Sequence, residues 1–166
     1  PTGLDAAEIT VQVEKEWMAY YEAAAKRITD ANSDVTINLQ EIGSFDHLGI
    51  LDETDASNPD VADVFALPAD RLTGLAAKDL LGAIDAPAIA ARLGGWADYE
   101  AGLGGLFKLD GEYLAFPYNI ETLVVFANMK NAEAEGIDLN TPVELDTITD
   151  PSHILLPVFD AWLGVA

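Results

Sequence analysis

The sequence predicts an α/β fold in which a mostly parallel sheet is flanked by helices. Strand-like and helix-like segments alternate along the first half of the chain. Two of the strand-like segments alternate apolar and polar residues, and a third is a nearly continuous apolar run of the kind buried on both faces of a parallel sheet. Such an alternating order favours parallel strands joined by right-handed crossovers.

The first three elements follow from local pattern. Residues 8–13, EITVQV, alternate and are rich in β-branched side chains, which predicts a strand. Residues 16–32 are alanine-rich with apolar positions at helical spacing, and Asn32 is a suitable stop. Residues 34–42 alternate again and predict a second strand.

The next stretch predicts a short helix, a loop and a third strand. The helix is expected around residues 45–51, and the acidic residues 52–60 form a polar loop. Residues 61–68, VADVFALP, are the continuous apolar strand. Residues 70–85 are helix-like but contain Gly74, so we expect a short helix followed by a loop.

The later elements are shorter. A helix is expected to begin at Pro87 and to end at Gly94–Gly95. Residues 101–117 indicate a loop followed by a hairpin that turns at Asp110–Gly111. Residues 121–128 predict another apolar strand. Residues 153–166 hold more apolar side chains than one face of a surface helix needs, so we expect them to contact another chain or to be poorly packed.

Composition excludes several classes of function. The chain has 29 acidic and 8 basic residues, a net charge of −21, which argues against nucleic acid and anionic membrane surfaces as partners. It has no cysteine, and its two histidines are far apart, so the sequence predicts neither a metal site nor a cofactor. Pro1 opens directly into polar sequence, which indicates a cytosolic protein or one whose leader has been removed.

Polar residues follow each predicted strand. Glu14–Lys15 come after the first strand, Ser44, Asp46 and His47 after the second, and Asp70–Arg71 after the third. Parallel strands deliver such residues to one rim, where ligands of open α/β sheets bind. Carboxylates beside scarce bases suit a neutral polyol, because the acids accept hydrogen bonds from hydroxyl groups and the bases donate to them.

Purely structural roles remain open for the same residues. Asp70 could be a helix N-cap with Arg71 paired to a nearby acid, and Glu14 also suits a helix N-terminus.

Trp17 and Tyr118 are candidates for stacking on a sugar face.

The order of several motifs resembles a known family. The segments ITVQVEKEW, INLQEIGSF, DVADVFALPADRLTGLAAKDLLGAID and KLDGEYLAFPYNIETLVVFAN are similar to the N-terminal part of extracellular solute-binding proteins of ABC sugar importers, of the maltose-binding type. The resemblance spans roughly residues 8–128. Three departures are Leu67 where that type has an aromatic, Ala127–Asn128 in place of Tyr-Asn, and no tryptophan near TPVEL.

The resemblance implies two lobes that close on an oligosaccharide and then dock on membrane permease subunits. Residues 1–120 would be lobe I, 121–128 the interlobe crossover strand, and 129–166 the beginning of a truncated lobe II, so this fragment should bind weakly or not at all. The protein would lie in the periplasm or be lipid-anchored outside the cytoplasmic membrane, with the anchoring cysteine lost with the leader. The implied ligand-binding residues are Glu14, Lys15, Asp70, Arg71 and Glu121.

Two alternatives stay open at this level. A glycosidase would need one carboxylic acid with a raised pKa, whereas two of the three candidate acids, Glu14 and Asp70, lie beside bases that lower the pKa of a carboxyl group. The chain could also be an assembling fragment without a ligand of its own, pairing through its apolar end.

Overall fold

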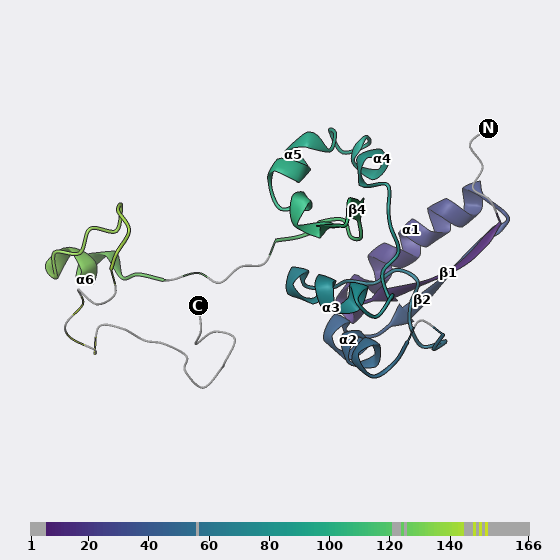
Figure 1. Cartoon of the computed structure of the whole chain (residues 1–166), viewed down its shortest axis with the longest axis horizontal. Coiled ribbons are helices and arrows are strands. Elements are labelled where there is room, and N and C mark those ends of the chain that lie inside the picture. The colour runs from purple at the N-terminus through teal and green to yellow at the C-terminus, as the bar shows by residue number, and fades with distance from the viewer. Residues whose placement is uncertain are drawn as a thin grey trace. The chain divides into compact units, whose positions relative to one another are not determined.

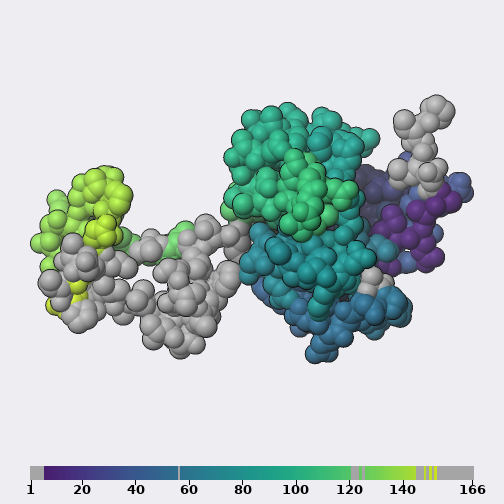
Figure 2. Space-filling model, viewed as in Figure 1, coloured from purple at the N-terminus to yellow at the C-terminus, as the bar shows by residue number. Residues whose placement is uncertain are grey.

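The computed structural model describes residues 6–55, 57–120, 124, 126–144, 148, 150 and 152. The chain divides into two compact units, Pro1–Tyr118 and Asn119–Ala166, which we describe separately. Figure 1 labels their helices and strands, and Figure 2 shows the same view with all atoms.

The first unit is built on a parallel pair of strands. Strand β1 (Ala7–Val13) pairs with β2 (Val35–Glu41), so that Ile9 lies opposite Ile37. A short 3₁₀ turn (Lys15–Trp17) and helix α1 (Met18–Ala31) connect them. This arrangement confirms the predicted α/β class with helices flanking a parallel sheet (Figure 1).

Helix α1 ends where the sequence predicts. Asn32 is its C-cap, and the Asn32 side-chain amide donates to the carbonyl oxygen of Ile28 at 2.8 Å. That bond satisfies one of the carbonyl groups that a helix leaves unpaired in its last turn.

The main core lies around α2 (Ser44–Glu53) and α3 (Leu72–Ala76). Four leucines form its buried centre, and partly buried apolar side chains from residues 61–67 pack against them. The buried leucines are Leu48, Leu51, Leu75 and Leu80. Residues 70–85 therefore do contain a short helix followed by a loop, as expected.

The prediction of a full third strand at residues 61–68 is wrong. This segment makes one parallel bridge, between Val64 and Val11, and Val64 is 54% exposed. Side-chain oxygens accept hydrogen bonds from backbone N–H groups that would bond to backbone carbonyl groups in a regular strand pair. The Thr10 N–H donates to the carboxylate of Asp63 at 2.8 Å, and the Ala66 N–H donates to Oε1 of Gln12 at 3.1 Å.

The remaining elements of the first unit are short. Helix α4 (Ala86–Ala90) ends earlier than predicted, and the Gly95 N–H then donates to the carbonyl oxygen of Ala90 at 2.9 Å. Gly94 and Gly95 have φ of 102° and 108°, which allow the chain to turn there. Helix α5 (Ala97–Ala101) precedes the expected loop, and a 3₁₀ turn (Gly104–Phe107) occupies much of that loop.

The hairpin prediction is confirmed. Strands β3 (Lys108–Leu109) and β4 (Glu112–Tyr113) are antiparallel and turn at Asp110 and Gly111, whose φ values are 51° and 92°. Two successive positive φ values are the requirement of a type I′ turn, which Asp-Gly meets. Tyr113 and Trp96 meet edge to face, with 4.8 Å between ring centroids.

The second unit has one helix among its described residues, α6 (Met129–Ala134). The predicted strand at 121–128 is absent at its described positions, 124 and 126–128, and Phe126 is 92% exposed. The expectation for residues 153–166 lies outside the described residues. Over the part of the chain that is described, none of the helices combines the length and the apolar character required to cross a membrane.

Candidate functional site

The side chain of Gln12, near the end of β1, forms hydrogen bonds to the ends of two neighbouring segments. The side chain is 5% exposed; its Nε2 donates to the carbonyl oxygen of Ile42 at 2.8 Å, and its Oε1 accepts from Ala66. The ends of β1, β2 and the segment 61–67 therefore lie side by side, as expected for the ligand-facing edge of an open parallel sheet.

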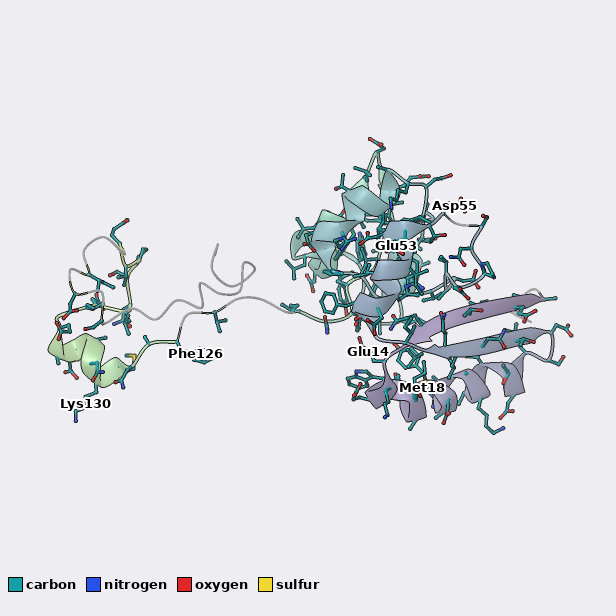
Figure 3. The ribbon with its side chains drawn as sticks, turned by 90° about the horizontal axis from the view of Figure 1, so that it is seen from below. Glu14, Met18, Glu53, Asp55, Phe126 and Lys130 are labelled. Atoms are coloured by element: carbon teal, nitrogen blue, oxygen red, sulfur yellow. The ribbon has the colours of Figure 1, made fainter. Side chains whose placement is uncertain are left out.

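Glu14 follows β1 at this edge (Figure 3). Its Oε1 accepts two hydrogen bonds from Ser44, from the backbone N–H at 2.9 Å and from the hydroxyl group at 2.6 Å. These two bonds, the hydroxyl first, lower the pKa of Glu14 despite a small opposing effect of burial. Ser44 is the first residue of α2, so Glu14 is an ionised carboxylate at a helix N-terminus, the structural role anticipated for it.

Lys15 and Trp17 continue from Glu14 in the 3₁₀ turn. The Trp17 N–H donates to the Glu14 carbonyl oxygen at 2.9 Å, and the Trp17 side chain is 60% exposed. An exposed indole and an exposed ammonium group thus lie next to an ionised carboxylate.

Asp70 and Arg71 lie in a second 3₁₀ turn, Ala69–Arg71. The N-cap of that turn is Pro68, and Asp70 makes no capping hydrogen bond there, so the capping role for Asp70 is not observed. Arg71 does pair with a nearby acid, Asp52, in the last turn of α2.

One residue of each predicted pair bonds to a residue of helix α2. Glu14 bonds to Ser44 at its N-terminus, while Arg71 and Lys78 contact its C-terminal end. Ser44 and Asp52 are eight residues apart, which is about 12 Å along a helix axis. The structure therefore brings Glu14 to Ser44 and Arg71 to Asp52, and it gives no direct bond between the two predicted pairs among the described residues.

The other two predicted site residues are in different situations. Glu121 lies outside the described residues. Tyr118 is the last residue of the first unit, and its side chain is 72% exposed.

Sequence reasoning missed the bond between Ser44 and Glu14 and the exposure of Phe45. Phe45 is 78% exposed and directly follows the residue that binds Glu14. Ser44 was expected among the polar residues after the second predicted strand, whereas Phe45 was treated only as part of the helix that begins there.

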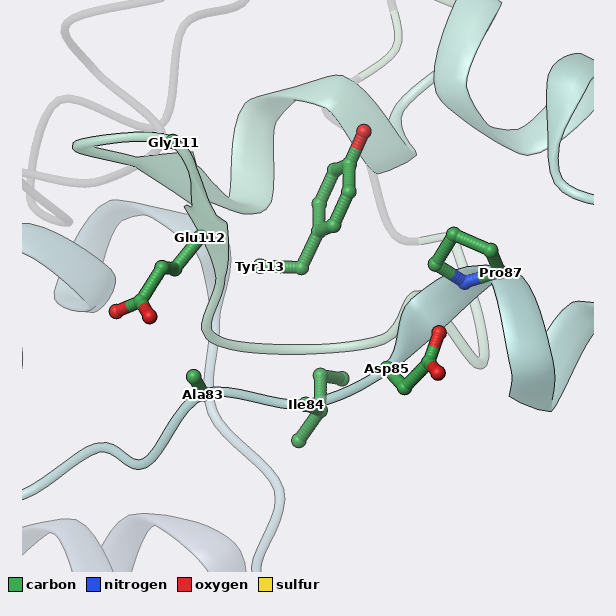
Figure 4. A pocket seen from close by; sticks show the side chains of 7 residues that line it. All are labelled: Ala83, Ile84, Asp85, Pro87, Gly111, Glu112 and Tyr113. Carbon is green, nitrogen blue, oxygen red and sulfur yellow. The ribbon is translucent and has the colours of Figure 1, made fainter.

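An open depression of about 460 Å³ lies elsewhere in the first unit, beside the bridge between Ile84 and Tyr113 (Figure 4). It contains none of the predicted site residues. One of its carboxylates, Asp85, caps α4 by accepting from the Ala88 N–H at 3.0 Å. No cluster of three metal-binding side chains occurs anywhere in the described ranges.

Comparison with models of protein families gives a match. Residues 13–155, most of the chain, match the family model described as bacterial extracellular solute-binding protein. No curated protein matches the chain.

Proposed function

The chain belongs to the family of bacterial extracellular solute-binding proteins, and from that membership we propose that it is the sugar receptor of an ABC importer. Proteins of this family bind solutes outside the cytoplasm and are not enzymes. The proposed ligand is an oligosaccharide of the maltodextrin type, captured between two lobes and delivered to membrane permease subunits.

The observation that carries the proposal is the environment of Glu14. Ser44 holds one carboxylate oxygen and keeps the group ionised, and Lys15 and Trp17 lie beside it along the chain. An ionised carboxylate accepts hydrogen bonds from hydroxyl groups, an ammonium group donates to them, and an indole packs against the C–H face of a ring. A net charge of −21 also favours a neutral solute over an anionic one.

The proposal assigns a second set of contacts to Asp70 and Arg71. The residues that bind Glu14 and Arg71 lie about 12 Å apart along α2. An oligosaccharide is long enough to span such a separation. Glu121 and Tyr118 complete the proposed set, as a hydrogen-bonding acid and a stacking ring.

The proposed organisation has residues 1–120 as lobe I, 121–128 as the interlobe segment and 129–166 as the beginning of lobe II. Ligand-driven closure of two lobes requires that the ligand bind the closed state more tightly than the open state. Attachment to the outer face of the membrane through a lipid is part of the same proposal.

The test is calorimetric titration of the protein as its gene encodes it, including whatever precedes Pro1 or follows Ala166. The ligands are maltodextrins, other oligosaccharides and simple polyols, with chromatography of the same samples to detect sugar release. The variant is Asp70→Ala/Arg71→Ala. Its matched control is Lys26→Ala/Asp30→Ala, which removes an exposed ion pair from α1.

Tight binding without turnover, lost in the first double variant and retained in the control, is the expected result. Binding that survives in both variants would remove Asp70 and Arg71 from the site. Failure of the wild type to bind any sugar would contradict the sugar receptor, and sugar release would favour a glycosidase.

A further inference from the structure

We propose that Asp52, in the last turn of α2, is a positioning residue that fixes the guanidinium group of Arg71 for ligand binding. This inference rests on the sugar-binding function proposed above, in which Arg71 contacts the ligand. It adds a residue, Asp52, that acts on affinity through Arg71 without contacting the sugar itself.

Asp52 receives two basic side chains on different atoms. A terminal nitrogen of Arg71 donates to the Asp52 carboxylate, and Nζ of Lys78 donates to the Asp52 carbonyl oxygen at 2.6 Å. The chain has 8 basic residues against 29 acidic ones. Two of these scarce bases therefore contact a single aspartate, and their contacts have different consequences.

Lys78 accounts for the end of the helix. Its Nζ also donates to the carbonyl oxygen of Leu51 at 3.3 Å. The ammonium group thus satisfies carbonyl groups of the last turn and places positive charge at the negative end of the helix dipole. Arg71 bonds instead to the Asp52 side chain and, within the described ranges, to no carbonyl group of α2. Capping of α2 therefore does not require the contact between Arg71 and Asp52.

The pair of Arg71 and Asp52 also contributes little to stability. Their side chains are 35% and 50% exposed, and water and ions screen a pair of this kind. What the pair does fix is the direction of a long, flexible side chain. A ligand that has to order a free arginine loses part of its binding free energy to that ordering. When Asp52 holds the guanidinium group in advance, this cost falls on folding and not on binding.

The surroundings of the pair suit such a support. Leu51, directly before Asp52, and Leu72, directly after Arg71, are 0% and 4% exposed. Both partners are therefore attached to the core of the first unit. The bond to Asp52 occupies one nitrogen of a group that has five N–H donors, so others remain for the hydroxyl groups of a sugar.

The test measures the affinity for maltotriose and cellotriose by calorimetry, on the protein as its gene encodes it. The variants are Asp52→Ala, Arg71→Ala and the two combined, with Asp52→Asn as a neutral variant of similar size in case the alanine variant does not fold. The matched control is Lys78→Met, which removes the other base that contacts Asp52 and leaves the carboxylate in place. Urea unfolding of each variant records its stability separately from its affinity.

We expect Asp52→Ala and Asp52→Asn to weaken trisaccharide binding about three- to tenfold, the effect of having to order one long side chain on binding. In the Arg71→Ala background, Asp52→Ala should cause no further loss of affinity, because the two residues act as one unit. A merely structural role of Asp52 would not produce this non-additivity. Lys78→Met should lower the urea midpoint and leave the affinity unchanged.

Several results would overturn this inference and leave the sugar receptor standing. They are equal or tighter binding in the Asp52 variants, losses of affinity that add in the double variant, and a loss in Lys78→Met as large as that in Asp52→Ala. A wild type that binds neither trisaccharide would contradict both proposals.

Discussion

Helices α1 and α2 flank the same small sheet but pack very differently. The fourteen residues of α1 include no buried side chain, whereas the ten residues of α2 bury His47, Leu48 and Leu51. Figure 3 shows α1 on one side of the strands and the rest of the first unit on the other.

The contrast has a geometric cause. Two strands lie about 5 Å apart, while a helix with its side chains is about 10–12 Å wide, so a two-stranded sheet cannot cover a helix face. Helix α2 is also covered by α3 and by residues 61–67, which supply the missing apolar surface. Burial in this protein therefore depends on what lies beyond the sheet, and stability should be concentrated around α2.

The largest expected difference is between core truncations on the two helices. Leu51→Ala should destabilise the protein by about 2–5 kcal/mol, because Leu51 is 0% exposed and its loss leaves a cavity. Ile28→Ala on α1, where the side chain is 40% exposed, should cost about 1 kcal/mol or less. Urea unfolding measures the loss of stability in both variants. Equal losses would contradict the proposed contrast between the two helices.

A second difference concerns pH and His47 of α2. The side chain is 0% exposed, its Nε2 accepts from the Ala62 N–H at 3.0 Å, and burial lowers the pKa of His47 below its usual 6.5. The unfolded chain then takes up a proton before the folded one does. Stability should be full above about pH 6.5 and should fall as the pH drops from there toward the lowered pKa of the folded state.

The variant His47→Leu isolates this effect. It should cost about 1–3 kcal/mol near neutral pH, because the Ala62 N–H loses its acceptor, and it should flatten the pH dependence between about pH 7 and pH 5. Urea unfolding across that range measures both quantities. An unchanged pH profile in the variant would show that His47 is not the titrating group.

The smallest effect is expected at the exposed ion pair of α1. Lys26 and Asp30 are 2.8 Å apart with side chains 74% and 61% exposed. Asp30→Asn should cost no more than about 0.5 kcal/mol, and the difference should disappear at high salt because solvent and ions screen the pair. A larger, salt-independent loss would mean that α1 is held by contacts that its exposed surface does not suggest.

Local chemistry made several elements predictable. The alternation in β1 and β2, the spacing in α1 and the stop at Asn32 are properties of neighbouring residues. The Asp110–Gly111 turn was predictable for the same reason, since both residues tolerate positive φ. The continuous apolar run at 61–68 carried no such information, because it fits a buried strand and a segment packed on helices equally well.

By itself, then, the sequence determined the class of the fold, the order of its first elements and the position of Glu14 and Trp17 directly after the first strand. Only the tertiary structure decided that Glu14 bonds to Ser44, that Arg71 pairs with Asp52 and that Phe45 remains in solvent. The physical reason is distance along the chain: those partners are 30 and 19 residues apart, and no local pattern of hydrophobicity or turn chemistry specifies which of many acids a distant base will meet.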